Sequence, residues 1–146
     1  MLLRVLWIGS LTGVVLSVWM YFWQQITTVK VYTLLLNVDF IPLIRQVDWN
    51  GFMLNLFHII ISWAIVLVYF WLRKRCRIGR WMIGIGLSIC AAFVYFPLSL
   101  VAKQPVPGVN DWSAIIIWFG GHLLYGLLVI TLTDIFYKSK FLGNQS

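Results

Sequence analysis

A chain of 146 residues that is 62% apolar and only 10% charged, with a mean hydropathy of +0.91, would expose a very large apolar surface in water. This composition excludes a soluble enzyme or soluble binding domain and predicts that lipid surrounds most of the chain. The net charge of +7 would suggest nucleic acid as the partner of a soluble protein, but here the basic residues flank apolar stretches, so we interpret the charge as a topology signal and predict no nucleic-acid partner.

Four apolar stretches are long enough to cross a hydrocarbon core about 30 Å thick. Because backbone groups find no water in lipid, each of these stretches is predicted to be helical. The sequence therefore predicts an all-α polytopic membrane protein, a four-transmembrane-helix bundle that forms a single integral membrane domain over residues 1–146. The predicted transmembrane helices cover residues 5–23, 52–72, 81–102 and 113–135.

Small residues recur at helical spacing along the first and third spans, and the fourth contributes one more. In the first span they stand at every fourth position, and such a stripe lets the backbone of another helix approach closely, within the molecule or between copies. The pattern predicts helix packing and is compatible with a homo-oligomer or a larger membrane partner. We assign this packing role to Gly9, Gly13, Ser17, Gly84, Ser88 and Gly126.

The connection after the first span contains an apolar stretch, residues 31–44, that is too short to cross the bilayer. Lys30, Thr33 and Asn37 fall on one face of a helix, and Pro42 ends the pattern. Residues 31–41 are therefore predicted to form an interfacial helix on the outer leaflet. A packed irregular cap over the helix ends is the alternative.

A strongly basic loop separates the second and third spans. Residues 73–80 carry five positive charges in Arg73, Lys74, Arg75, Arg77 and Arg80, whereas the loops expected on the opposite side are poor in basic residues. The positive-inside rule places this loop and both termini in the cytoplasm. We also expect the loop to contact anionic lipid headgroups.

The third span contains Pro97, which lacks a backbone donor. We expect it to kink the helix near Phe93.

Polar side chains are rare in the spans, and those of the second and fourth fall on one face of each helix. At a rise of about 1.5 Å per residue, the two histidines lie roughly 9 and 14 Å below the outer end of their spans, so they are expected to meet in the outer half of the membrane. We call this predicted set the outer polar cluster, and it comprises Asn55, His58, Ser62, His122 and Tyr125.

Several interpretations of the cluster remain open. The first is a non-catalytic membrane component in which the cluster serves helix packing or responds to protons. The second is a small permease or channel for a polar solute, and the third is a haem- or metal-binding membrane protein, because two imidazoles on facing helices can ligate an iron. We find no catalytic constellation, and we predict no catalytic residue, no metal site and no cofactor.

Four short motifs follow one another in an order and spacing similar to those of a known family. They are Leu11-Thr-Gly13-Val-Val15, Phe57-His58-Ile-Ile-Ile61-Ser62, Phe96-Pro97-Leu98 and Gly121-His122-Leu123. Together they resemble the YagU-like bacterial inner-membrane proteins, whose biochemical activity is not established. The resemblance implies a multi-pass protein of the bacterial cytoplasmic membrane and places His58 and His122 at the family's histidine positions. It carries over no catalytic residue, and the chain departs from the family where Trp19, Tyr21 and Trp23 replace charged residues of the first helix.

Overall fold

All regular secondary structure in the described part of the chain is helical. The computed structural model describes all residues except 1, 39–40, 42–46, 48 and 143–146. For residues 137–142 it describes the backbone but not the side chains. The described part of the chain contains no strand. The helices are α1 (Leu2–Thr27), α2 (Val31–Leu35), α3 (Gly51–Arg75), α4 (Arg80–Phe93), α5 (Tyr95–Val101) and α6 (Trp112–Leu142).

Four helical segments are long and apolar enough to cross a membrane. They are Leu2–Thr27, Gly51–Arg75, Arg80–Val101 and Trp112–Phe136. The prediction of an all-α chain with four helices long and apolar enough to span a membrane is therefore confirmed. Local signals explain two of the starts: the Asn50 side chain accepts a hydrogen bond from the Met53 amide at 2.9 Å, and Asp111 accepts one from Ala114 at 3.0 Å.

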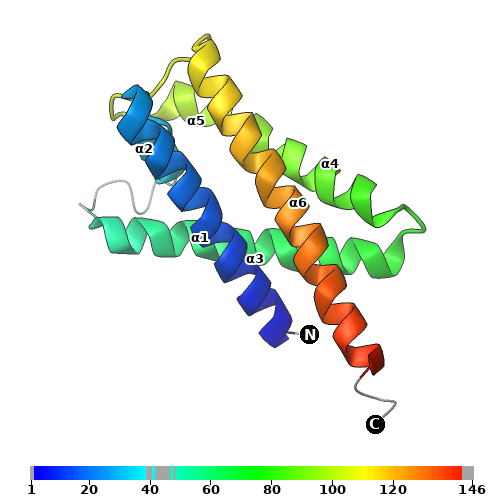
Figure 1. Cartoon of the computed structure of the whole chain (residues 1–146). Helices are drawn as coiled ribbons and strands as arrows, with labels where there is room; N and C mark the ends of the chain where they lie inside the picture. The colour runs from blue at the N-terminus through cyan, green and yellow to red at the C-terminus, as the bar shows by residue number, and fades with distance from the viewer. Residues whose placement is uncertain (1, 39–40, 42–46, 48, 143–146) are drawn as a thin grey trace.

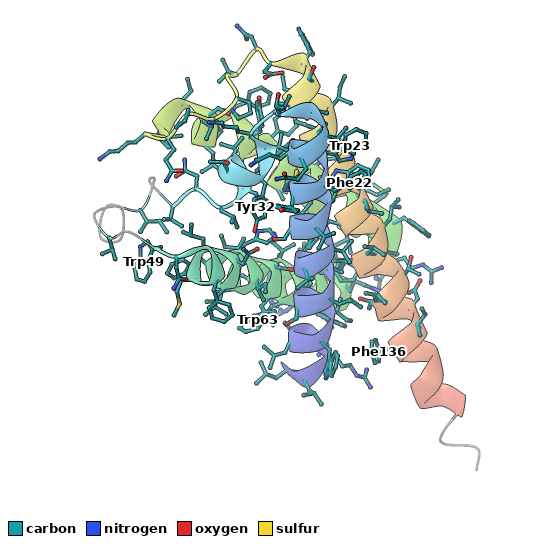
Figure 2. All side chains as sticks on the ribbon, turned by 60° about the vertical axis from the view of Figure 1, so that its left-hand side comes forward. Phe22, Trp23, Tyr32, Trp49, Trp63 and Phe136 are labelled. Carbon is teal, nitrogen blue, oxygen red and sulfur yellow. The ribbon has the colours of Figure 1, made fainter. Side chains whose placement is uncertain are left out.

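Helix α1 packs on α3, helix α4 packs on α6, and the contact between α1 and α6 joins these two pairs. In Figure 1, α1 and α6 lie side by side and run in opposite directions, so the first residues of α1 and the last of α6 are at the same end. Helix α3 runs across α1 in both Figure 1 and Figure 2, and α4 packs on α6. From the loop that joins them, α3 and α4 diverge like the arms of a V, with α5 at the far end of one arm.

Close backbone approaches hold these pairs together. A Cβ on Gly9 would lie 2.6 Å from Trp63 Cδ1, and one on Gly13 would lie 3.2 Å from Ser62 Cβ. Figure 2 shows Trp63 reaching α1, where its indole Nε1 donates to Ser10 Oγ at 3.0 Å. The same principle joins α4 to α6, where Gly126 faces Ser88. The structure thus uses these small residues for packing inside one chain.

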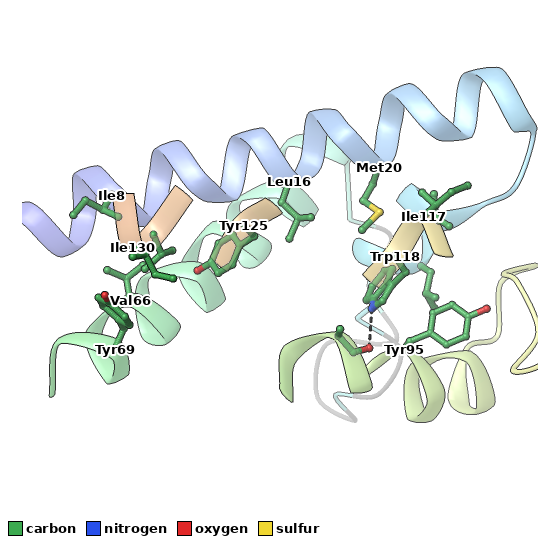
Figure 3. Close-up of a cluster of buried hydrophobic side chains, with 14 of the residues drawn as sticks. Ile8, Leu16, Met20, Val66, Tyr69, Tyr95, Ile117, Trp118, Tyr125 and Ile130 are labelled. Atoms are coloured by element: carbon green, nitrogen blue, oxygen red, sulfur yellow. Dashed lines mark hydrogen bonds between the residues drawn. The ribbon is translucent and has the colours of Figure 1, made fainter. Parts of the chain in front are cut away.

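Buried apolar side chains fill the space between α1, α3, α4 and α6. Figure 3 shows one group around Ile8, Val66 and Ile130, and a second in which Met20 lies near Trp118. All five of these side chains are at most 2% exposed. The core therefore runs along the α1–α6 pair, against which α3 and α4 pack.

The expectation of an interfacial helix over residues 31–41 is wrong in its extent. Helix α2 ends at Leu35, and residues 39–40 lie outside the described part. The segment that contains α2 also lacks the solvated polar face of an interfacial helix. Asn37, which was expected on that face, is only 8% exposed, and the apolar residues Val31 and Leu34 are fully buried. The reason is that the segment is packed as a cap over the helix ends, which was the alternative.

The side chain of Gln24 explains why α2 starts where it does. Its Oε1 accepts hydrogen bonds from the amides of Tyr32 at 2.9 Å and Thr33 at 3.0 Å. These amides belong to the first turn of the helix, where no intrahelical acceptor exists. An acceptor from α1 thus caps α2, a contact that depends on the tertiary fold.

The third span is interrupted at Val94, three residues before Pro97. Pro97 offers no N–H to the carbonyl of Phe93, four residues earlier. Next to this break, the indole Nε1 of Trp118 donates to the carbonyl of Ala92 at 2.9 Å, as Figure 3 shows. A side chain of α6 therefore supports the backbone of α4 where α5 begins.

Asp134 on α6 joins the ends of the basic loop. Its carboxylate lies 3.1 Å from the Arg80 guanidinium and 3.5 Å from that of Arg73. The three side chains are partly exposed, so the ion pairs contribute little stability by themselves. Their consequence is positional, because they hold the start of α4 and the end of α3 against α6.

Candidate functional site

Ser62 and Tyr125 of the outer polar cluster are joined directly. The Ser62 hydroxyl donates to the Gly9 carbonyl at 2.7 Å and lies 3.0 Å from the Tyr125 hydroxyl. Because the one proton of Ser62 is committed to Gly9, the Tyr125 hydroxyl is the donor between the two side chains. This chain of hydrogen bonds links α6 to α3 and α3 to α1, so these two residues serve helix packing.

Asn55 lies in a separate hydrogen-bond network. Its Oδ1 accepts from Ser17 at 3.0 Å, and its Nδ2 donates to the Tyr32 hydroxyl at 2.7 Å and to the Gly51 carbonyl at 2.8 Å. Asn55 therefore ties α3 to α1 and α2. It does not line the cavity that the histidines share.

The histidines occupy a different position from these packing residues. His122 is 6% exposed, its Nδ1 lies 2.9 Å from the Trp118 carbonyl, and its ring stacks on the Trp118 indole with centroids 4.7 Å apart. His58 is 9% exposed, and its ring lies next to the backbone of Gly13. Its Nε2 is buried and has no hydrogen-bond partner among the described residues. Such an atom is rare in a folded protein and calls for an explanation.

Both histidines line one cavity of about 380 Å³. Its walls are α3 on one side and α4 with α5 on the other, where the arms of the V diverge, and residues of α1, α2 and α6 complete the lining. Apart from His58, His122, Ser62, Tyr125 and a cysteine, the lining side chains that the structure describes are hydrocarbon or the indole of Trp118. We call this cavity the lateral cleft.

The rim of the lateral cleft is open to the outer surface of the bundle. Ile61 on α3 is 49% exposed and Val94 at the start of α5 is 45% exposed, and both line the cleft. Cys90 on α4 is also exposed and lines it. The cleft therefore has a buried floor that carries the histidines and an apolar mouth between α3 and α4.

Several residues of the site were missed by the sequence analysis. Thr12 lies 3.4 Å from the Ser62 hydroxyl, and the Trp19 indole donates to the Ile117 carbonyl at 3.2 Å. A Cβ on Gly121 would lie 2.6 Å from Trp19 Cδ1, which explains why a glycine precedes His122. The Gly120-Gly121 pair was the one sequence signal of a close helix contact at this place. Which side chain it faces was not visible, because that depends on how α1 packs on α6.

The described residues contain no group of three or more His, Cys, Asp or Glu side chains that would hold a metal ion. The two histidines thus have no third ligand beside them within that part of the chain.

No family model, no curated protein and no solved structure matches the chain. The resemblance to the YagU-like proteins accordingly rests on the order of the four motifs.

The Ser62–Tyr125 contact predicts a measurable coupling. Ser62→Ala and Tyr125→Phe should each lower the free energy of unfolding by about 1 kcal/mol, and the double variant should lose less than the sum by roughly 0.5–1 kcal/mol. The measurement is denaturation in mixed micelles. Thr131→Ala is the matched control, because Thr131 is exposed and its hydroxyl bonds to Leu127 of its own helix. Strict additivity between Ser62→Ala and Tyr125→Phe would contradict the contact.

Proposed function

We propose that this protein is a non-catalytic membrane component that binds an amphiphilic molecule, drawn from the bilayer, in the lateral cleft. The observation that carries the proposal is the lateral cleft itself, an apolar cavity of about 380 Å³ whose floor carries His58 and His122 and whose rim is exposed on the outer surface of the bundle. The apolar part of an amphiphilic molecule fits the hydrocarbon walls, and its polar part fits the floor, where the histidines lie.

The position of the mouth supports entry from the lipid. Exposed surfaces of membrane-spanning helices contact acyl chains, and the rim residues Ile61 and Val94 lie on such surfaces. An apolar molecule thus reaches the cleft without crossing a headgroup layer. The small permease or channel for a polar solute is the weaker candidate, because a polar solute needs more hydrogen-bonding groups than this lining offers.

The proposal divides the roles that the sequence analysis gave to one cluster. Asn55, Ser62 and Tyr125 are hydrogen-bonded between helices and serve packing. His58 and His122 serve binding instead of packing or proton response. A haem or metal site remains the third candidate, and the two imidazoles are the only observation in its favour among the described residues.

We further propose a multi-pass protein of the bacterial cytoplasmic membrane, with both termini and the loop 73–80 in the cytoplasm. The basic loop supports this orientation through the positive-inside rule, and the motif resemblance supports the bacterial membrane. In that orientation the loop lies next to anionic lipid headgroups. Association with a second copy or a larger membrane partner belongs to the same proposal.

Protection of Cys90 tests binding in the lateral cleft. A Cys76→Ser variant in lipid nanodiscs keeps Cys90 as its one thiol, and N-ethylmaleimide labels it. Dodecanol at ten times its dissociation constant should slow this labelling about tenfold, because little of the cleft is then empty. The matched control is Cys90→Ser, in which the loop thiol Cys76 should react at an unchanged rate. Equal labelling of Cys90 at every dodecanol concentration would contradict the proposed function.

A further inference from the structure

A second pocket lies where the loop between α5 and α6 passes the end of α1 (Figure 1). Its volume is about 320 Å³, and it shares no lining residue with the lateral cleft. It is lined by residues 28–30, which follow the span Leu2–Thr27, and by residues 105–107 and Asp111, which precede the span that begins at Trp112. The pocket therefore lies where spanning helices leave the hydrocarbon core, at the depth of lipid headgroups. We call it the end pocket.

Two opposite formal charges line the end pocket, Lys30 from the turn after α1 and Asp111 from the loop before α6. Neither side chain has an ion-pair partner among the residues that the structure describes. One carboxylate oxygen of Asp111 accepts from the Ala114 amide at 3.0 Å, and the other accepts no hydrogen bond within the described part. Lys30 is exposed, and its long flexible stem lets the ammonium move over the pocket. A cation and an anionic oxygen are thus both available to a ligand.

The turn that brings Lys30 to the end pocket has a strained backbone. Thr28 has a φ of 62°, the left-handed conformation in which a helix usually ends on glycine. A β-branched residue adopts this conformation only at a cost in free energy. Thr28 is the one non-glycine residue with positive φ in the described part of the chain, and it lines the pocket. Strain of this kind gathers at functional sites, where the surrounding structure holds it in place.

The opposite wall of the end pocket is held in position before any ligand arrives. Pro105 and Pro107 have restricted backbone angles. The Gly108 carbonyl accepts from the Tyr95 hydroxyl at 2.8 Å and from the Asp111 amide at 3.0 Å. These bonds tie the loop to α5 and fix the backbone of Asp111. A site that is already ordered loses less entropy when it binds.

From these features we infer that the end pocket binds a zwitterion of the phosphoethanolamine type, with its phosphate at Lys30 and its primary ammonium at Asp111. A ligand of one sign would satisfy one of the two charges and be repelled by the other. The free carboxylate oxygen needs a hydrogen-bond donor, which a primary ammonium supplies and the quaternary ammonium of choline lacks. The ligand is the headgroup of a phosphatidylethanolamine lipid or free phosphoethanolamine. The inference does not depend on binding in the lateral cleft.

The test compares two lipids that differ only in the methylation of the ammonium. Dioleoyl phosphatidylethanolamine and dioleoyl phosphatidylcholine are added at equal concentrations to the protein in dodecyl maltoside micelles, and native mass spectrometry measures how much of each is bound. The ethanolamine lipid should bind about fivefold more tightly, because its ammonium donates to a carboxylate at a partly exposed site. Free phosphoethanolamine is then added as a competitor. Displacement of the lipid identifies a soluble ligand, and lack of displacement identifies the headgroup within the membrane.

Two substitutions separate the two charges. Asp111→Asn keeps an oxygen that caps α6 but removes the negative charge, so the preference for the ethanolamine lipid should fall to nearly none. Lys30→Gln removes the contact to the phosphate that both lipids share. It should weaken the binding of both lipids by about fivefold and leave their ratio unchanged. Lys103→Gln is the matched control, because Lys103 belongs to the same loop but does not line the end pocket, and it should change neither quantity.

Equal binding of the two lipids to the parent protein overturns the inference. It is also overturned if Asp111→Asn keeps the full preference, since the ammonium would then be recognised elsewhere. A loss of binding in Lys103→Gln equal to that in Lys30→Gln would reduce the effect to general surface charge and would likewise overturn it. None of these results affects the proposed function, which is tested at Cys90 in a cavity with different walls.

Discussion

Replacing Trp118 with alanine is expected to lower the free energy of unfolding by about 3–5 kcal/mol. The indole is 2% exposed, and three contacts depend on it. Its Nε1 donates to the Ala92 carbonyl, its rings meet Tyr95 edge to face with centroids 5.7 Å apart, and it stacks on His122. The substitution leaves a void next to the interruption of the third span, where the backbone already lacks a regular helical bond.

Denaturation in mixed micelles measures this loss, and Trp112→Ala is the matched control. Trp112 belongs to the same helix but is 74% exposed, so its removal should change the free energy of unfolding by less than about 0.5 kcal/mol. Trp118→Phe separates the indole donor from the ring, with an expected loss of about 1–2 kcal/mol. Equal losses for Trp118→Ala and Trp112→Ala would contradict the buried position of Trp118.

Adding a single methyl group at Gly126 is expected to cost about 1–3 kcal/mol. A Cβ there would lie 2.6 Å from Ser88 Oγ and 3.1 Å from the backbone oxygen of Gly84. Ser88 cannot easily turn away, because its hydroxyl donates to the His122 carbonyl. Gly126→Ala must therefore push α4 away from α6.

Gly86 provides the control for this prediction on α4. A Cβ on Gly86 would meet no other element within 4 Å in the described part of the chain, so Gly86→Ala should be neutral or stabilise the helix by up to about 1 kcal/mol. Adding Ser88→Gly to Gly126→Ala should recover part of the lost stability, since it removes the atom that clashes. A Gly126→Ala protein as stable as the parent would show that α4 and α6 do not touch at this point.

The positions of the two histidines could be predicted from the spacing of polar residues along their helices. The helical spacing of His58 with Ser62 and of His122 with Tyr125 was sufficient to predict that the polar faces of the second and fourth spans meet. Distance from the helix ends placed both histidines at similar depth, and the structure has them lining one cavity. Spacing along a helix is a local property, so it is readable without the fold.

The partner of each polar side chain was not readable in this way. Asn55 belongs by spacing to the face of His58, yet it bonds to Ser17 and Tyr32. The segment after α1 likewise has an amphipathic pattern, but an acceptor from Gln24 and the burial of Asn37 make it a cap. In both cases the decisive atom comes from another element.

Length and hydropathy by themselves predicted an all-helical chain with four segments long and apolar enough to span a membrane, because a continuous apolar stretch of about 20 residues satisfies its backbone hydrogen bonds in lipid as a helix. The tertiary structure alone decided that α3 and α4 diverge, that a cleft opens between them and that both histidines line this cleft. These features depend on which helix faces meet and how closely. The small residues of α1 recur periodically in the sequence, but which side chain each of them meets, such as Trp63 at Gly9, depends on the tertiary structure.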